Sequence, residues 1–247
     1  MLKRIKKIKQ VFFSYRLLKA LIRHRVLGGA EHRYILEHGF KTVVDIGANR
    51  GQFTLASRTW APSARVIAFE PLQRPADRFQ KVFKEDSNVI LHRVAIGSYS
   101  GNAVIHISAA DDSSSLLPIG ALQEKYFPGT KEVGKKTVQL GKLHEYVSKQ
   151  ELIAPAMLKI DVQGYELESL IGCDKLLERF SHIYVECSFV ELYSGQALAH
   201  EVIDWLRNRH FQLKGVFNIS YQKNGNALQG DFFFVNHNGN KNLSGLK

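Results

Sequence analysis

The sequence predicts one doubly wound α/β domain, an open sheet with helices on both faces. Three observations predict it: short apolar segments alternate with amphipathic segments from residue 41 onward, a small-residue turn follows the first apolar segment, and a hairpin pattern closes the chain. The 247 residues suffice for one substantial core without a second domain. We therefore expect a domain over 34–236, preceded by a basic helical arm over 1–33 and followed by a polar tail over 237–247.

The arm is expected to form a basic helix over 2–26. Apolar residues recur on one side at a 3.6-residue period: Ile5, Ile8, Phe12, Tyr15 and Ile22. Residues 1–33 carry ten lysines and arginines against one acid, whereas the rest carries 24 against 22. The helix packs on the domain with a solvated face, contacts anionic lipid at a membrane surface, or contacts nucleic acid.

The stretch Lys41–Gly51, KTVVDIGANRG, is expected to organise the fold. A β-branched strand ends at Asp45, a tight turn contains Gly47, Asn49 and Gly51, and a helix follows without a break. Exposed N–H groups and the positive end of the helix dipole favour a carboxylate or phosphate at such a turn. The glycines are expected to let the backbone approach the ligand, because a Cβ would intrude.

The spacing of this turn discriminates between ligands. A dinucleotide fingerprint is G-x-G-x-x-G, whereas Asp45, Gly47 and Gly51 give D-x-G-x-x-x-G, without the middle glycine that admits a pyrophosphate. Asp45 also puts negative charge where a phosphate would sit. The ammonium and carboxylate of an amino acid suit an acid beside a helix N-terminus, and S-adenosylmethionine carries both together with a nucleoside. A βα turn whose glycines serve geometry alone is the alternative.

A second strand over 64–70 ends in Glu70, about twenty residues after the first turn. In doubly wound folds an acid at this place hydrogen-bonds a ribose diol, whose two donors match the acceptors of a carboxylate. Glu70 as a surface acid without a ligand is the alternative. The two motifs in this order predict a nucleoside site.

With these motifs in place the sequence resembles the FkbM-type S-adenosylmethionine-dependent methyltransferases. The resemblance runs from about residue 41 to 236 and rests on DIGANRG, FEP, LKIDVQGYE over 158–166 and VECSF over 185–189. The family usually has an acid where Gln163 stands. The resemblance implies a seven-stranded Rossmann-like methyltransferase sheet with an antiparallel last strand. It also implies S-adenosylmethionine as the cofactor and O-methylation, typically of sugar or polyketide hydroxyls.

The remaining elements follow from periodicity and from turn residues. Predicted strands cover 88–96, 102–108, 136–140 and 156–162, a strand ending at 187, and a terminal hairpin of 212–221 with 228–236. Predicted helices cover 30–38, 75–83, 143–149, a segment that begins at 164, and 196–209. The Pro- and Gly-punctuated region 109–134 is expected to be a loop, either a lid over the substrate or a linker.

Parallel strands place their carboxyl ends at one edge of a sheet, so the residues there are the candidate site. We expect the cofactor to be held by Asp45, Gly47, Asn49, Gly51, Glu70, Ala95 and Asp161, with adenine meeting backbone and apolar groups at Ala95. A hydroxyl acceptor must lose a proton during methyl transfer. The candidate bases, in order, are Asp161, Glu186, His144 and Asp231.

The composition of the chain narrows the class of protein and its location in the cell. Cys173 and Cys187 predict buried free thiols in a reducing compartment, and neither a disulfide framework nor a thiolate metal site. No convincing signal peptide and no run of about 18 apolar residues occurs, which predicts a cytoplasmic protein, peripheral to the inner membrane face if the arm binds lipid. The near-neutral body argues against a nucleic-acid acceptor. A nucleic-acid methyltransferase and a non-catalytic nucleoside-binding protein remain the alternatives to a glycan or small-molecule O-methyltransferase.

Overall fold

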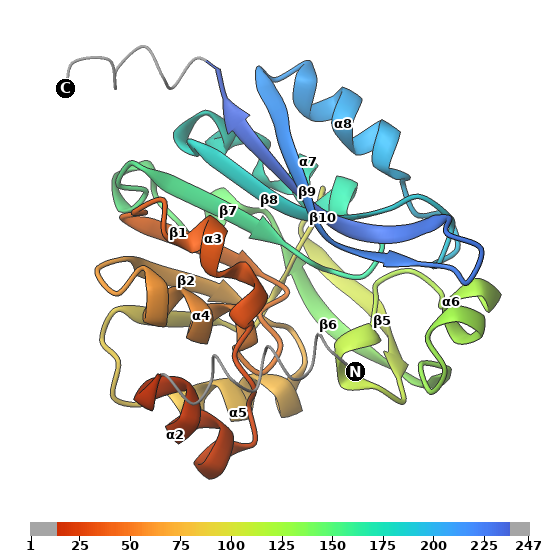
Figure 1. Cartoon of the computed structure of the whole chain (residues 1–247), viewed down its shortest axis with the longest axis horizontal. Helices are drawn as coiled ribbons and strands as arrows, with labels where there is room; N and C mark the ends of the chain where they lie inside the picture. The colour runs from red at the N-terminus through yellow and green to blue at the C-terminus, as the bar shows by residue number, and fades with distance from the viewer. Residues whose placement is uncertain (1–13, 238–247) are drawn as a thin grey trace.

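A central sheet of seven strands organises the chain, and the computed structural model describes residues 14–237 (Figure 1). The strand order is β3-β2-β1-β7-β8-β10-β9. The bounds are β1 (Thr42–Ile46), β2 (Arg65–Phe69), β3 (Val89–His92), β7 (Ala156–Ile160), β8 (His182–Ser188), β9 (Phe211–Tyr221) and β10 (Ala227–Asn236). The first five strands in this order run parallel, and β10 lies antiparallel between β8 and β9. The predicted seven-stranded sheet with an antiparallel last strand is confirmed.

Helices cover both faces of this sheet. They are α3 (Arg33–Leu36), α4 (Gln52–Trp60), α5 (Gln73–Phe83), α7 (Glu166–Cys173) and α8 (Ala199–Arg207). Helix α2 (Tyr15–His24) packs on α4 and α5, and α6 (Ala121–Tyr126) lies off the faces of the sheet. Figure 1 shows α2 to α5 gathered on one side of the molecule and α7 and α8 on the other. Alternate residues of β1 and β7 supply the two cores: Val43 and Met157 face the side of α3 and α4, whereas Val44 and Leu158 face that of α7 and α8.

A second sheet of three strands lies beside the first, in the order β4-β6-β5. Its strands are β4 (Ala95–Ile96), β5 (Gly101–Ser108) and β6 (Glu132–Gly141). The prediction of one strand over 88–96 is wrong here, because the chain leaves the main sheet after His92 and pairs Ala95 with Leu140. The side chains of Val94 and Ile96 stay in the core across this break, so the apolar pattern concealed it.

Short turns replace one predicted helix. Residues 143–149 were expected to be helical, but they form only the 3₁₀ turn η3 (Leu143–Glu145) and the start of η4 (Lys149–Glu151). In each turn a glutamate accepts the backbone N–H three residues earlier, which closes a single turn. The other 3₁₀ turns are η1 (Ala30–His32), η2 (Asp111–Ser113) and η5 (Asp174–Arg179).

Helix α2 packs on the domain with a face opposite to the predicted one. Leu17 and Ala20 are buried against α4 and α5, whereas Tyr15 and Ile22 of the predicted stripe are 79% and 70% exposed. Apolar residues surround this helix, so their spacing alone did not identify the buried side. Ile5, Ile8 and Phe12 lie outside the described residues. Because Leu17 and Val26 belong to the core, residue 33 does not mark a boundary in packing.

Candidate active site

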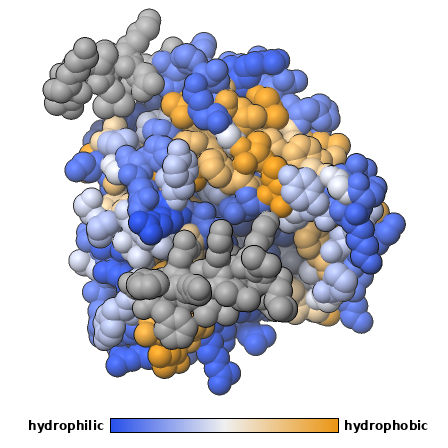
Figure 2. Space-filling view, in the orientation of Figure 1, coloured by the Kyte–Doolittle hydropathy of each residue, from blue (hydrophilic) through white to orange (hydrophobic). Residues whose placement is uncertain are grey.

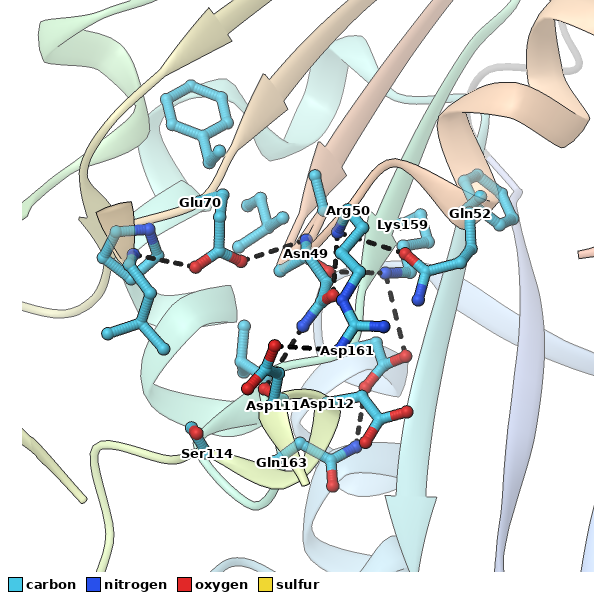
Figure 3. A pocket seen from close by; sticks show the side chains of 18 of the residues that line it. Asn49, Arg50, Gln52, Glu70, Asp111, Asp112, Ser114, Lys159, Asp161 and Gln163 are labelled. Atoms are coloured by element: carbon cyan, nitrogen blue, oxygen red, sulfur yellow. Dashed lines mark hydrogen bonds and ion pairs between the residues drawn. The ribbon is translucent and has the colours of Figure 1, made fainter. Parts of the chain in front are cut away.

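A cavity of about 600 Å³ opens at the carboxyl ends of β1, β2 and β7 (Figure 3). Its wall comes from segments far apart in the sequence: residues 25–29 and 31–32, the turn 46–50, residues 69–72 and 94–96, residues 111–112 and 114–116, and residues 161–163, together with single side chains that include Gln52, Phe53 and Lys159. This is the edge where open α/β sheets bind ligands.

The turn after β1 needs its glycines mainly for protein packing. Gly47 and Gly51 have φ of 79° and 90°, a region that favours glycine. A Cβ on Gly47 would lie 1.9 Å from the carbonyl oxygen of Asp161, and one on Gly51 would lie 2.5 Å from the Phe83 ring. Gly47 lines the cavity and Gly51 does not, so the predicted reason for Gly51, approach of the ligand, is wrong.

Asp45 faces the protein instead of the cavity. Strand β1 continues to Ile46, and the fully buried Asp45 carboxylate accepts a hydrogen bond from Thr54 Oγ1 at 2.7 Å. Its other oxygen lies 3.1 Å from Lys159 Nζ. Asp45 does not line the cavity, so the expectation that it contacts the cofactor is corrected: it holds Lys159 and the start of α4.

Lys159 connects this buried acid to the cavity. Its Nζ donates to the carbonyl oxygen of Gly47 at 3.3 Å and lies 3.8 Å from Asp161 Oδ2 and 5.5 Å from the centre of the Phe53 ring. Burial acts to lower the pKa of Lys159, but the charges of Asp45 and Asp161 outweigh it and the pKa is raised. The ammonium is therefore retained, and it places positive charge beneath the turn.

Glu70 lies at the other side of the turn, and its carboxylate holds the local backbone. Oε2 accepts the Asn49 N–H at 3.0 Å and Oε1 accepts the Leu72 N–H at 2.8 Å. Burial raises the pKa of Glu70 to about 7. Each carboxylate oxygen has a second lone pair, so Glu70 retains acceptor capacity for two ribose hydroxyls. Asn49 and Glu70 both line the cavity.

Asp161 directs its carboxylate into the cavity with 38% of its side chain exposed. Gln163 orients it: Nε2 donates to Asp161 Oδ1 at 2.9 Å and to Glu186 Oε2 at 2.8 Å, while Oε1 accepts from the Tyr193 hydroxyl at 2.8 Å. Gln163 has a φ of 58°. The amide at the position where the family resemblance leads one to expect an acid thus joins two carboxylates without adding a third charge.

The three other candidate bases do not line the cavity. Glu186 lies inside β8, its oxygens accept the amides of Gln163 and Gln229, and burial followed by the charge of Asp161 raises its pKa. His144 lies in η3, which packs against α7, and its Nε2 is 3.1 Å from Lys175 Nζ.

The prediction that His144 is a base of the site is wrong, because β6 and η3 place it away from the strand ends. Asp231 in β10 accepts hydrogen bonds from Tyr184 and Asn218.

The region 109–134 contributes one wall of the cavity. Arg50 NH2 lies 2.8 Å from Asp111 Oδ2, and Asn49 Nδ2 donates to the Asp111 carbonyl oxygen at 3.2 Å. Figure 3 shows these groups meeting beside the Asn49–Arg50 turn, between Glu70 and Gln163. Asp111 thus lies against the turn after β1, called the cofactor turn below.

The residues present fit S-adenosylmethionine. Glu70 has acceptors left for a ribose diol, and Phe69, Leu72, Ala95 and Ile96 form an apolar wall beside it that suits an adenine ring. The backbone N–H groups of residues 47–51 are all bonded within the protein, so the expectation that they bind the carboxylate of the methionine part is wrong. The N-terminus of α4, where Phe53 lines the cavity, suits that carboxylate instead. Among residues 14–237 no cluster of His, Cys, Asp or Glu suitable for a metal ion occurs.

This geometry defines a nucleoside-binding doubly wound domain. The family model described as "Methyltransferase FkbM domain" matches residues 45–213, and the chain belongs to that family as an S-adenosylmethionine-dependent methyltransferase. The resemblance of the motifs is thereby confirmed.

Two characterised relatives match most of the chain. The 2-O-methyltransferase NoeI of Sinorhizobium fredii is 27% identical over 71% of this chain and 76% of its own length. The hexuronic acid methyltransferase AglP of Haloferax volcanii is 30% identical over 70% of this chain and 69% of its own length. Among solved structures, precorrin-6y C5,15-methyltransferase of Geobacter metallireducens has a TM-score of 0.47 and 11% identity, covering 86% of this chain and 94% of that one.

Sequence reasoning assigned no role to several residues of the site: Lys159, Arg50, Asp111 and His32. A signal existed for Lys159, because a lysine in an otherwise apolar buried strand requires a charged partner. Asp45 is its register partner on β1. No local signal joined Arg50 to Asp111, since the two are sixty-one positions apart.

Replacing Lys159 by Met is expected to destabilise the fold strongly, because the buried Asp45 carboxylate loses its counter-charge. Breaking a buried pair in this way costs about 3–5 kcal/mol, which corresponds to a fall in Tm of about 6–20 °C for a chain of this size. Thermal unfolding followed by circular dichroism measures it.

The double variant Asp45→Asn with Lys159→Met should recover most of the loss, and the exposed Lys175→Met should change little. A Lys159→Met protein as stable as the parent would contradict the assigned role.

Proposed function

We propose that the chain transfers a methyl group from S-adenosylmethionine to a hydroxyl of a sugar or glycan. The observation that carries the proposal is the Asp161 carboxylate, exposed in the cavity beside the cofactor turn and fixed by Gln163. The relatives' names, a 2-O-methyltransferase and a hexuronic acid methyltransferase, support a carbohydrate hydroxyl as the acceptor.

The residues divide the work between donor and acceptor. The cofactor supplies a methyl group already activated on a sulfonium, so the protein has to hold an acceptor oxygen in line with it, within about 3–3.5 Å. Glu70 holds the ribose, the carbonyl oxygen of Gly47 accepts from the ammonium of the amino-acid end, and the N-terminus of α4 faces its carboxylate. Asp161 accepts the proton of the acceptor hydroxyl, a contribution of about 10²–10⁴-fold. Lys159 Nζ lies 3.8 Å from Asp161 Oδ2, on the same cavity wall.

A panel of methyl glycosides tests the reaction. Methyl-labelled S-adenosylmethionine is supplied with a methyl hexuronide, a methyl hexoside and a methyl 6-deoxyhexoside, and total RNA serves as the competing acceptor class. We expect label on a glycoside oxygen, located by mass spectrometry and NMR. Label on RNA and on none of the glycosides would contradict the proposal.

Glu70→Gln is expected to weaken the binding of S-adenosylhomocysteine, because the ribose loses a charged acceptor. The loss is about 1.5–3 kcal/mol, measured by titration calorimetry. Ribose donors favour the ionised form, and the pKa of about 7 leaves most Glu70 protonated at pH 6 and ionised at pH 8. Affinity of the parent protein should therefore rise about tenfold from pH 6 to pH 8.

The Glu70→Gln variant should show no such pH dependence, because its amide does not titrate. Unchanged affinity in a folded Glu70→Gln protein would remove Glu70 from the cofactor site.

Asp161→Asn retains the shape of the side chain and removes its basicity. Turnover at saturating cofactor should fall by about 10²–10⁴-fold, whereas the affinity for S-adenosylhomocysteine should change little. The reverse pattern, lost affinity with retained turnover, would make Asp161 a cofactor-binding residue.

We propose further that the N-terminal end of the protein contacts anionic lipid. Tyr15, Leu21 and Ile22 are exposed on α2 among basic residues, and Figure 2 shows an apolar area at the position of this helix. Residues 1–33 supply ten lysines and arginines, each adding about 1 kcal/mol near an anionic leaflet. No helix of the described part is long and apolar enough to cross a bilayer.

Co-sedimentation with vesicles tests this contact. The full chain should bind phosphatidylserine-containing vesicles at low salt and less at 0.15 M, where the screening length is about 8 Å. Removing residues 2–13 or replacing Tyr15 and Ile22 by Ser should weaken binding and leave glycoside methylation intact.

Truncation is not extended to residue 26, because it would remove Leu17 and Val26 from the core. Equal sedimentation of the parent and both variants would exclude this surface.

A further inference from the structure

His32 lies in the wall of the cavity without a role in cofactor binding. It belongs to η1, ahead of the first strand, and 16% of its side chain is exposed. The ring meets the edge of Phe53 at a centroid distance of 5.0 Å and that of Tyr184 at 5.5 Å. Phe53 also lines the cavity, in the first turn of α4. His32 is therefore held firmly at a wall that Glu70 and Ala95 do not form.

The hydrogen bonds around the ring decide which nitrogen carries the proton. The Tyr184 hydroxyl donates its only proton to Asp231 Oδ2 at 2.9 Å, so its oxygen acts as an acceptor toward His32. His32 Nδ1, 3.1 Å away, is then the donor. This leaves Nε2 of the neutral ring with a lone pair.

The lone pair of Nε2 is not used inside the described part of the protein. Between residues 14 and 237, Nε2 forms no hydrogen bond, and Glu31 Oε1 lies 3.9 Å from it. Gly29 keeps this edge of the ring open, since a Cβ there would lie 2.5 Å from His32 Cδ2 and 3.0 Å from Nε2. Gly28 and Gly29 both line the cavity.

The charges that face His32 come from three elements and from the segment after β7. Burial lowers its pKa most, Asp231 in β10 and Glu31 in η1 raise it, Lys159 in β7 lowers it, and Asp161 after β7 raises it. The net pKa is lowered from the usual 6.5, so the ring is neutral at pH 7.

We propose that His32 is an acceptor-binding residue, whose Nε2 receives a hydrogen bond from a second hydroxyl of the sugar that is methylated. This rests on the proposed function and extends it. A sugar presents several hydroxyls in fixed relative positions, and one contact with Asp161 leaves its rotation undefined. A second contact at His32, oriented through Tyr184 and Asp231, selects which hydroxyl faces the methyl group.

His32→Asn separates this role from a structural one. The amide of Asn occupies the place of Nδ1 and can still bond Tyr184, whereas the group at Nε2 is lost. With the best methyl glycoside of the panel, KM for the glycoside should rise about three- to tenfold, the loss expected for one hydrogen bond. The affinity for S-adenosylhomocysteine should remain within about twofold, whereas part of the label should move to a neighbouring hydroxyl because the rotation of the sugar is no longer fixed.

Two further variants complete the test. Tyr184→Phe leaves His32 in place but removes the hydroxyl oxygen that orients the ring. It should therefore raise KM for the same glycoside, but less than His32→Asn does. His38→Asn alters an exposed histidine that does not line the cavity and should change neither constant.

An unchanged KM in both His32→Asn and Tyr184→Phe, with active parent protein, overturns the inference and leaves the proposed function standing. A loss of S-adenosylhomocysteine affinity in His32→Asn would place His32 in the cofactor site and also overturns it. Label on RNA and on none of the glycosides refutes the proposed function, and this inference with it.

Discussion

The ion pair between Asp45 and Lys159 is the constraint on which the site depends. The two residues are register partners on adjacent parallel strands, and both strands end one residue later. A buried carboxylate without its partner is expensive, so the pair resists any shift of β1 against β7. The Gly47 turn and the Asp161 segment, which leave these strands and touch one another, are thereby fixed in relative position. The proposed cofactor and acceptor groups thus lie on two segments that are in direct contact.

Much of the fold followed from local patterns, because strand ends and turns have short-range causes. The alternation of strands and helices, the terminal hairpin and the placing of Glu70 and Asp161 at the cavity are of this kind. The number of strands and the antiparallel last strand were implied by the resemblance to the family. The family model and the motifs at 45–51 and 158–166 point to the same class of enzyme. The strand ends, the turn and the hairpin needed only periodicity and the chemistry of a βα turn, whereas the class of enzyme needed the motifs of the family.

Other features depend on contacts between distant segments, which a single sequence does not specify. Histidine is a common general base, but the sequence does not show that the second sheet places His144 away from the strand ends. Asp45 looked like a ligand-facing acid because its partner lies 114 positions further along and was not paired with it. His32 went unnoticed because its significance comes from Tyr184 and Asp231, on strands near the end of the chain.

The packing of the N-terminal segment has a practical consequence for how this protein is divided. The region shared with the family spans residues 45–213, yet a fragment cut at those limits would begin inside β1 and lack nearly all of the β9–β10 hairpin. It would also lack Leu17 of the core and the wall formed by residues 25–32. The region that matches the family is therefore shorter than the region that forms the complete core. Expression fragments and domain grafts should therefore keep α2 and the whole β9–β10 hairpin.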